Sequence, residues 1–92
     1  MTFKMEKSWE GRKVVIRLVG RVRSEHLEEL KGHLGTNASQ FVLDLTEVTL
    51  VDVDVVRFLG TCECEGVTLL HCSPYIREWI LREQREPGGI SA

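Results

Sequence analysis

One stretch limits what this chain can fold into more than any other: residues 41–59, FVLDLTEVTLVDVDVVRFL. It opens with an apolar run at residues 41–43, which is typical of a buried strand. A polar joint at residues 44–49 and an apolar pair at residues 50–51 follow. Beyond them, apolar side chains recur at the spacing of one helix face: Val55, Val56, Leu59 and Cys62. The stretch therefore predicts a strand that leads through a short loop into a helix.

The predicted helix, residues 53–65, begins between two carboxylates. Asp52 and Asp54 flank Val53, and acidic groups in a first turn are favourable because the helix dipole is positive there. We expect Asp52 to cap the helix, Asp54 to occupy its first turn, and Asp44 to bond to loop N–H groups. A structural role is thus favoured for all three aspartates over acid–base or metal chemistry.

The other elements fall on both sides of this unit. The patterning predicts strands at residues 2–9, 14–19, 41–45 and 67–71, and helices at residues 24–35, 53–65 and 73–83. Ser24 and Ser73 are the predicted helix caps, Gly11 lies in the turn between the first two strands, and Gly66 ends the second helix. The third strand is apolar nearly throughout, so we expect it to be covered on both faces.

The order β-β-α-β-α-β-α predicts an α/β fold. We expect one domain with a small mixed sheet that is parallel over its later strands, helices packed on the sheet, and right-handed crossovers. At 92 residues the chain supports a single core. The domain is expected to span residues 1–84, and residues 85–92 to form a flexible tail, because that segment contains Pro87-Gly88-Gly89.

Composition narrows the classes of function. The formal net charge of −2 argues against a protein that holds nucleic acid through phosphate contacts, so we expect no nucleic-acid partner. No apolar run approaches the roughly 20 residues that cross a bilayer, and no signal peptide opens the chain. We therefore expect a cytoplasmic protein without direct membrane insertion, while a soluble partner of a membrane complex stays open.

The residues that usually carry chemistry do not assemble into a recognisable site. Cys62, which we expect in the core, and Cys64 point about 200° apart on a helix, and adding Cys72 still leaves a fourth metal ligand missing. His26 and His33 are seven residues apart rather than four, which favours solvated histidines. Neither a glycine-rich phosphate loop nor a paired nucleophile and base is visible. We predict no enzyme activity, catalytic residue, cofactor or metal site; the alternative is a small enzyme or metal protein that uses the aspartates or cysteines.

The second predicted helix has more apolar surface than one face can bury. Val53 and Phe58 fall outside the stripe that faces the sheet. In one interpretation Val53 packs on a neighbouring loop and Arg57 is solvated. In the other, the first turn contacts another protein, because apolar groups surrounded by charge often mark an interface. The candidate partner-binding residues are Asp52, Val53, Asp54 and Arg57.

Three segments, in this order, resemble the STAS domain, the fold of bacterial anti-sigma factor antagonists. Residues 14–22, VVIRLVGRV, resemble the end of that family's opening hairpin. Residues 42–52, VLDLTEVTLVD, resemble its strand and loop with two aspartates. Residues 66–80, GVTLLHCSPYIREWI, resemble its later strand and Ser-Pro helix start. The resemblance covers nearly the whole chain and implies a STAS-like fold.

The resemblance also implies a function, with one departure. In STAS antagonists a serine or threonine follows the aspartate that matches Asp52, and its phosphorylation releases the anti-sigma kinase. Here Val53 stands at that position, followed by Asp54, so the usual switch is absent. Asp54 carries one charge, fewer than a phosphate group does. The implied function is a non-enzymatic interaction module that regulates transcription by binding an anti-sigma factor without a phosphorylation switch at Val53.

Two further expectations come from the same resemblance. STAS domains also occur with anion transporters and lipid-transport complexes, so the alternative function is a soluble accessory subunit of a membrane transporter complex. The family usually adds another strand and helix, so this chain is C-terminally shortened by comparison, and its strand at residues 67–71 is expected at an exposed sheet edge. Exposed edges pair with other chains, which implies a homodimer or a larger complex.

Overall fold

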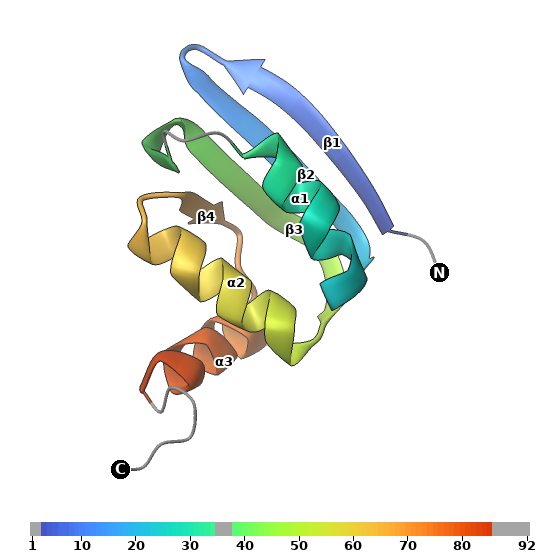
Figure 1. Ribbon diagram of the computed structural model, residues 1–92, viewed down its shortest axis with the longest axis vertical. Coiled ribbons are helices and arrows are strands. Elements are labelled where there is room, and N and C mark those ends of the chain that lie inside the picture. Colours follow the sequence, from blue (N-terminus) through green and yellow to red (C-terminus); the bar gives the residue numbers. More distant parts are fainter. Residues whose placement is uncertain (1–2, 35–37, 86–92) are drawn as a thin grey trace.

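The computed structural model describes residues 3–34 and 38–85, and Figure 1 shows their arrangement. The strands are β1 (Phe3–Glu10), β2 (Lys13–Val22), β3 (Phe41–Val51) and β4 (Thr68–Leu70). The α-helices are α1 (Leu27–His33), α2 (Val53–Cys64) and α3 (Pro74–Arg85). Two short 3-10 turns, η1 (Ser24–His26) and η2 (Ala38–Gln40), precede α1 and β3. The predicted order of strands and helices is confirmed.

The four strands form one mixed sheet in the order β1-β2-β3-β4. β1 and β2 are antiparallel, and the turn between them contains Gly11, whose φ of +65° favours glycine. β3 pairs in parallel with β2 and with β4, so the sheet is parallel over its later strands, as predicted. Gly66, with a φ of +111°, lies at the predicted end of the second helix.

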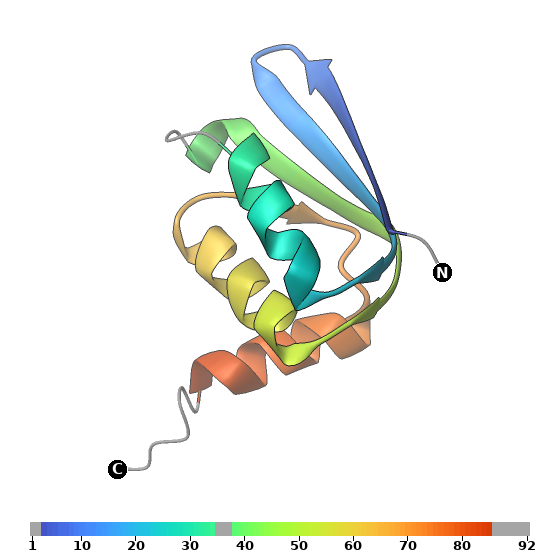
Figure 2. The same cartoon turned by 45° about the vertical axis from the view of Figure 1, so that its right-hand side comes forward.

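α1 and α2 lie side by side on one face of the sheet, and α3 packs against α2 (Figures 1 and 2). A continuous apolar core fills the space between these layers. Its most deeply buried side chains come from both the sheet and the helices: Ile16, Leu18, Leu30, Leu43, Val55, Leu59, Ile76 and Ile80. Cys62 belongs to the same core, as predicted.

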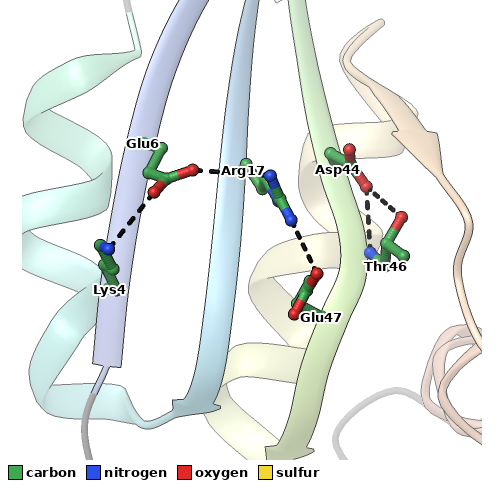
Figure 3. Close-up of polar contacts among 6 residues, drawn as sticks. All are labelled: Lys4, Glu6, Arg17, Asp44, Thr46 and Glu47. Carbon is green, nitrogen blue, oxygen red and sulfur yellow. Dashed lines mark hydrogen bonds and ion pairs between the residues drawn. The ribbon is translucent and has the colours of Figure 1, made fainter.

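The opposite face of the sheet carries a row of charges (Figure 3). Arg17 of β2 pairs with Glu47 of β3 at 2.7 Å and with Glu6 of β1 at 3.6 Å, while Lys4 approaches Glu6 at 3.4 Å. The expectation that β3 is covered on both faces therefore holds only in part. Val42, outside the core cluster, is only 6% exposed, whereas the side chain of Glu47 on the charged face is 47% exposed.

β3 is longer than its apolar residues indicate. The sequence predicts a polar joint at residues 44–49, but the strand continues through them to Val51, and β2 continues past Gly20 to Val22. Irregular pairing near Gly20 fits extra residues of β3 against β2, as β-bulges do. Polar residues are tolerated in this part of β3 because several of its side chains face solvent.

Neither predicted serine caps its helix through its hydroxyl. The Ser24 N–H donates a hydrogen bond to Asp52, and the Ser24 side chain makes no described capping bond. The Ser73 hydroxyl is buried without a hydrogen-bond partner among the described residues, although the Ser73 carbonyl accepts from the Arg77 N–H at 2.9 Å. α3 does begin at the proline, as predicted, and includes Arg85. The predicted tail at residues 85–92 was therefore wrong at Arg85, which belongs to α3. Residue 35, where the first helix is predicted to end, and residues 86–92 lie outside the described residues.

Candidate functional site

Asp52 joins the start of α2 to the turn that precedes α1. Its Oδ1 accepts a hydrogen bond from the Val55 N–H at 3.1 Å, which is the geometry of an N-cap. Its Oδ2 accepts from the Ser24 N–H at 2.9 Å. The predicted capping role of Asp52 is confirmed, and the contact with Ser24 adds a link between two elements that the sequence does not reveal.

The residues after Asp52 present a formed first helical turn at the surface. Val53 is partly buried and Asp54 is exposed. No hydrogen bond or ion pair involves the Asp54 carboxylate within the described part of the chain. The turn therefore offers an apolar side chain beside a free negative charge, which is the arrangement expected for the candidate partner-binding residues.

Arg57 lies one turn further along α2 and is held toward α3. Its Nε donates to Glu83 Oε1 at 2.9 Å, and the Arg57 side chain is 56% exposed. Arg57 is therefore exposed, as the interpretation of a solvated side chain expects, and its ion pair also links α2 to α3. The rest of the guanidinium group stays at the surface beside the first turn.

A groove of about 650 Å³ runs between α1 and α2. Its apolar lining comes from both helices, from the residue after α1, from the start of β3 and from the residue before β4: Leu27, Leu34, Phe41, Phe58, Cys62 and Val67. Four charged residues lie around it: Lys31, Asp54, Arg57 and Glu65. The volume and the mainly apolar lining are those of a binding groove, and two candidate residues, Asp54 and Arg57, form part of it.

The sequence only partly indicates this groove. Leu27, Leu30 and Leu34 form one predicted apolar stripe on the first helix, but the structure buries only Leu30 completely. Phe58, for which the sequence offers no partner, lies under Lys31, with 5.9 Å between Lys31 Nζ and the ring centroid. The groove is indicated by the partial burial of these side chains. That partial burial depends on how α1 and α2 pack, so it cannot be recognised from the sequence alone.

A second groove, of about 360 Å³, lies between α2 and α3. Arg57, Thr61 and Glu65 line both grooves and so form a ridge between them. Close approach of the two helices occurs at Gly60, where an added Cβ would lie 3.2 Å from Gln84 Nε2 and 3.4 Å from Ile80 Cγ2. The surface around the candidate residues is therefore a ridge flanked by two hollows.

The cysteines show no sign of a reactive site. Burial raises the pKa of Cys62 to about 11, with a further contribution from the charge of Glu65. Burial also raises the pKa of Cys72, so both thiols stay protonated at neutral pH. Cys64 is exposed and accepts a long contact of 3.6 Å from Gln84. Within residues 3–34 and 38–85, no group of three His, Cys, Asp or Glu side chains could hold a metal ion.

Asp44 bonds within its own strand rather than to a loop. Its Oδ1 accepts from the Thr46 N–H at 3.0 Å and from the Thr46 hydroxyl at 2.6 Å (Figure 3). Burial alone would raise the pKa of Asp44, but the two Thr46 hydrogen bonds, with the nearby charges of His71 and Arg17, outweigh it and lower the pKa. The predicted structural role and the predicted bond to a backbone N–H are confirmed, but the residue that donates it, Thr46, belongs to β3 and not to a loop.

His26 is a structural residue that the sequence does not identify. Its ring stacks on Phe3, with 4.0 Å between ring centroids and 12° between ring planes. Its Nδ1 accepts a hydrogen bond from the Arg23 N–H at 3.0 Å. The expectation of a solvated His26 was therefore wrong, because the η1 turn brings the ring over β1.

Comparison with known proteins gives a fold and no sequence family. No family model matches the chain, and no curated protein matches it. In the described residues no helix is long and apolar enough to cross a membrane. One similar solved structure is the unphosphorylated form of the anti-sigma factor antagonist SpoIIAA, with a TM-score of 0.64 and 22% identity over 84% of this chain and 79% of that one.

A second match is an uncharacterized protein of the DUF3478 family with a SpoIIAA-like fold, from Shewanella loihica PV-4. It has a TM-score of 0.45 and 17% identity, and the match covers 95% of this chain and 80% of that chain. Only the likeness to SpoIIAA supports a fold, since its TM-score is above 0.5 and it covers most of both chains. The chain therefore has a STAS-like fold, as its sequence resemblance implies.

Proposed function

We propose that the chain is a non-enzymatic protein-interaction module that binds an anti-sigma factor through the start of α2. The observation that carries the proposal is the surface turn formed by Val53 and Asp54 on a fold shared with the antagonist SpoIIAA. The ridge that continues to Arg57 has a groove on each side, and this uneven surface allows a partner to bind with specific shape complementarity. Asp52 supports this surface by fixing the turn.

Binding by this module is not switched by phosphate at Val53. Valine has no hydroxyl group, and Asp54 supplies one negative charge where a phosphate would supply between about 1.5 and 2. The interaction is therefore constitutive at this position. Transcription is regulated by the amount of the protein and of its partner.

Affinity capture from the native cells tests the proposal, with wild type compared with Val53→Asp. Val53 is only partly buried, and an acid in a first helical turn is compatible with the helix dipole, so the variant keeps its fold. A charge placed in the interface must be desolvated, and it should reduce capture at least tenfold. Ser8→Asp, on exposed β1, is the matched control and should capture as wild type does.

The identity of the captured protein separates the alternatives. An anti-sigma factor recovered by wild type and Ser8→Asp, and lost with Val53→Asp, supports the proposal. Recovery of an ATPase or permease instead would assign the chain to the transporter-accessory class. Equal recovery by all three proteins would show that the interface lies elsewhere, and recovery of no specific protein would refute the module.

Self-association is proposed at the free edge of β4. Among the described strands β4 pairs only with β3, so its second edge has no strand beside it. Leu70 on this strand is 37% exposed. An open edge strand presents unpaired N–H and C=O groups, and a second copy of the chain can add its own β4 there.

A further inference from the structure

We propose that the groove between α1 and α2 docks an amphipathic helix of the partner, about three turns long, with a basic residue at each end and an acidic residue between them. The inference rests on the proposed function in one respect, namely that the occupant belongs to a protein that meets the start of α2. It adds the chemistry by which that protein is recognised.

The apolar part of the argument is the lining of the groove. Leu27 of α1, Leu34 just after α1, and Phe58 of α2 are partly buried, so they keep surface that a partner can cover. α1 and α2 run side by side in the same direction (Figure 2), and residues of both helices line the groove. A helix that lies in such a groove contacts it through apolar side chains at positions i, i+4 and i+7.

The charges around the groove give the occupant its pattern. Asp54 lines the groove at the start of α2, and Glu65 lines it just past the end of that helix. Lys31 lines it from α1, over Phe58. These three side chains form no ion pair within the described residues, whereas the fourth charge, Arg57, is paired with Glu83. A complementary segment therefore carries base, acid and base in that order.

The separation of the acids favours a helix over a small molecule. Asp54 and Glu65 are eleven residues apart along one helix, which is about 16 Å at the α-helical rise. A small acid could meet Lys31 but would leave both carboxylates unpaired. Three helical turns of a partner span the same distance and reach all three charges.

Two synthetic peptides of 15 residues test the proposal. Both carry leucine at positions 3, 7, 10 and 14. The first has lysine at positions 2 and 13 with glutamate at position 6, and the second has these three charges reversed. Each is titrated into ¹⁵N-labelled protein, and backbone amide shifts report affinity and position. The first peptide should move the amides of α1 and α2 and bind at least tenfold more tightly than the second, with a difference that shrinks at high salt.

A charge swap on the protein sharpens the comparison. Lys31→Glu should weaken binding of the first peptide about fivefold and strengthen binding of the second by a similar factor. The reason is that the charge at residue 31 would then repel position 6 of the first peptide and attract position 6 of the second. Lys7→Glu on exposed β1 is the matched control and should change neither affinity. Circular dichroism establishes that both variants keep the fold.

Several results would overturn the docking helix. Equal affinity for the two peptides, no binding of either at millimolar concentration, or shifts confined to the sheet would each do so. Laurate shifting the groove amides while neither peptide does would assign the groove to a small apolar acid. The assay contains no anti-sigma factor, so it can fail independently of the proposed function. Capture that is lost with Val53→Asp but unchanged with Lys31→Glu would keep that function and reject the groove.

Discussion

At the scale of single residues, Asp52 is the aspartate of the site that links two elements. One carboxylate oxygen caps α2, and the other holds the Ser24 N–H of η1. Asp54, two residues later, is exposed and without a described bond. The two aspartates look equivalent in sequence, yet only one of them connects elements.

Asp52→Ala should lower the free energy of unfolding by about 1–3 kcal/mol, because the cap and a second hydrogen bond are lost together. Asp54→Ala should cost less than about 1 kcal/mol, since only a dipole interaction is removed. Urea unfolding followed by tryptophan fluorescence measures both. Equal losses for the two variants would contradict the linking role of Asp52.

Asp44 makes the stability of the protein depend on pH. Its pKa is lowered in the folded protein, so its contribution is complete above the unfolded value of about 4 and is lost as the pH falls through the folded value. The unfolding free energy of wild type should therefore fall below about pH 4, and Asp44→Asn should remove part of that fall. Thr46→Val should reduce it as well, while Thr61→Val on α2 should not. If the unfolding free energy of Asp44→Asn falls in acid as much as that of wild type, other carboxylates are responsible.

At the scale of elements, an ion pair between α2 and α3 is better formed than an ion pair within α3. Arg77 of α3 binds Glu63 of α2 with two hydrogen bonds, at 2.7 and 3.0 Å, and both side chains are about two-thirds buried. Within α3, Arg82 and Glu78 approach to only 3.8 Å and are mostly exposed. Geometry and burial both favour the first pair as a contributor to stability.

A double-mutant cycle on Glu63→Ala and Arg77→Ala should give a coupling free energy of about 1 kcal/mol. The same cycle on Glu78→Ala and Arg82→Ala should give about 0.3 kcal/mol or less. Unfolding in urea supplies the free energies. A coupling for the first pair no larger than that of the second would mean that the pair between Arg77 and Glu63 contributes no more than an exposed pair within one helix.

The sequence predicts the elements well where apolar periodicity and turn residues agree. The helix after Asp52, the turn at Gly11 and the α3 start at Pro74 are all of this kind. It fails at residues 44–49 of β3, because polar side chains in a strand with one open face have the composition of a loop. Ser24 also misleads, because serine is a residue type that suits a cap. In the structure its hydroxyl makes no described capping bond, and its N–H donates to the carboxylate of Asp52, which is distant in sequence.

The candidate site is predicted less completely than the fold. Val53, Asp54 and Arg57 are adjacent on one helix, so their common face follows from helical spacing. Lys31 joins them only because α1 lies beside α2, and no pattern in the sequence encodes that packing. Long-range pairs such as Arg57 with Glu83 are likewise absent from any local rule.

At the scale of the whole molecule, the sheet has two well-paired inner strands and two edges. β2 and β3 have neighbours on both sides, whereas β1 and the three-residue β4 have one each among the described strands. Amide groups in the inner strands open only with large parts of the structure, while those of a short edge strand open locally.

Hydrogen exchange under native conditions should follow this order at low protein concentration. The amides of β2 and β3 should exchange slowest, and those of β4 at least a hundredfold faster. Raising the concentration should protect β4 selectively as a second copy pairs with it, and Leu70→Lys should abolish that protection. Protection of β4 that does not change with concentration would contradict pairing of copies at this edge.

The tie between Ser24 and Asp52 has a kinetic consequence for any protein that binds at the start of α2. The end of β2, the η1 turn and the first turn of α2 are fastened together before a partner arrives. Little conformational entropy is then lost in the encounter, so association is limited by orientation rather than by rearrangement. Cutting this tie should slow association as well as weaken the complex, even though Asp52 itself is turned toward its own chain.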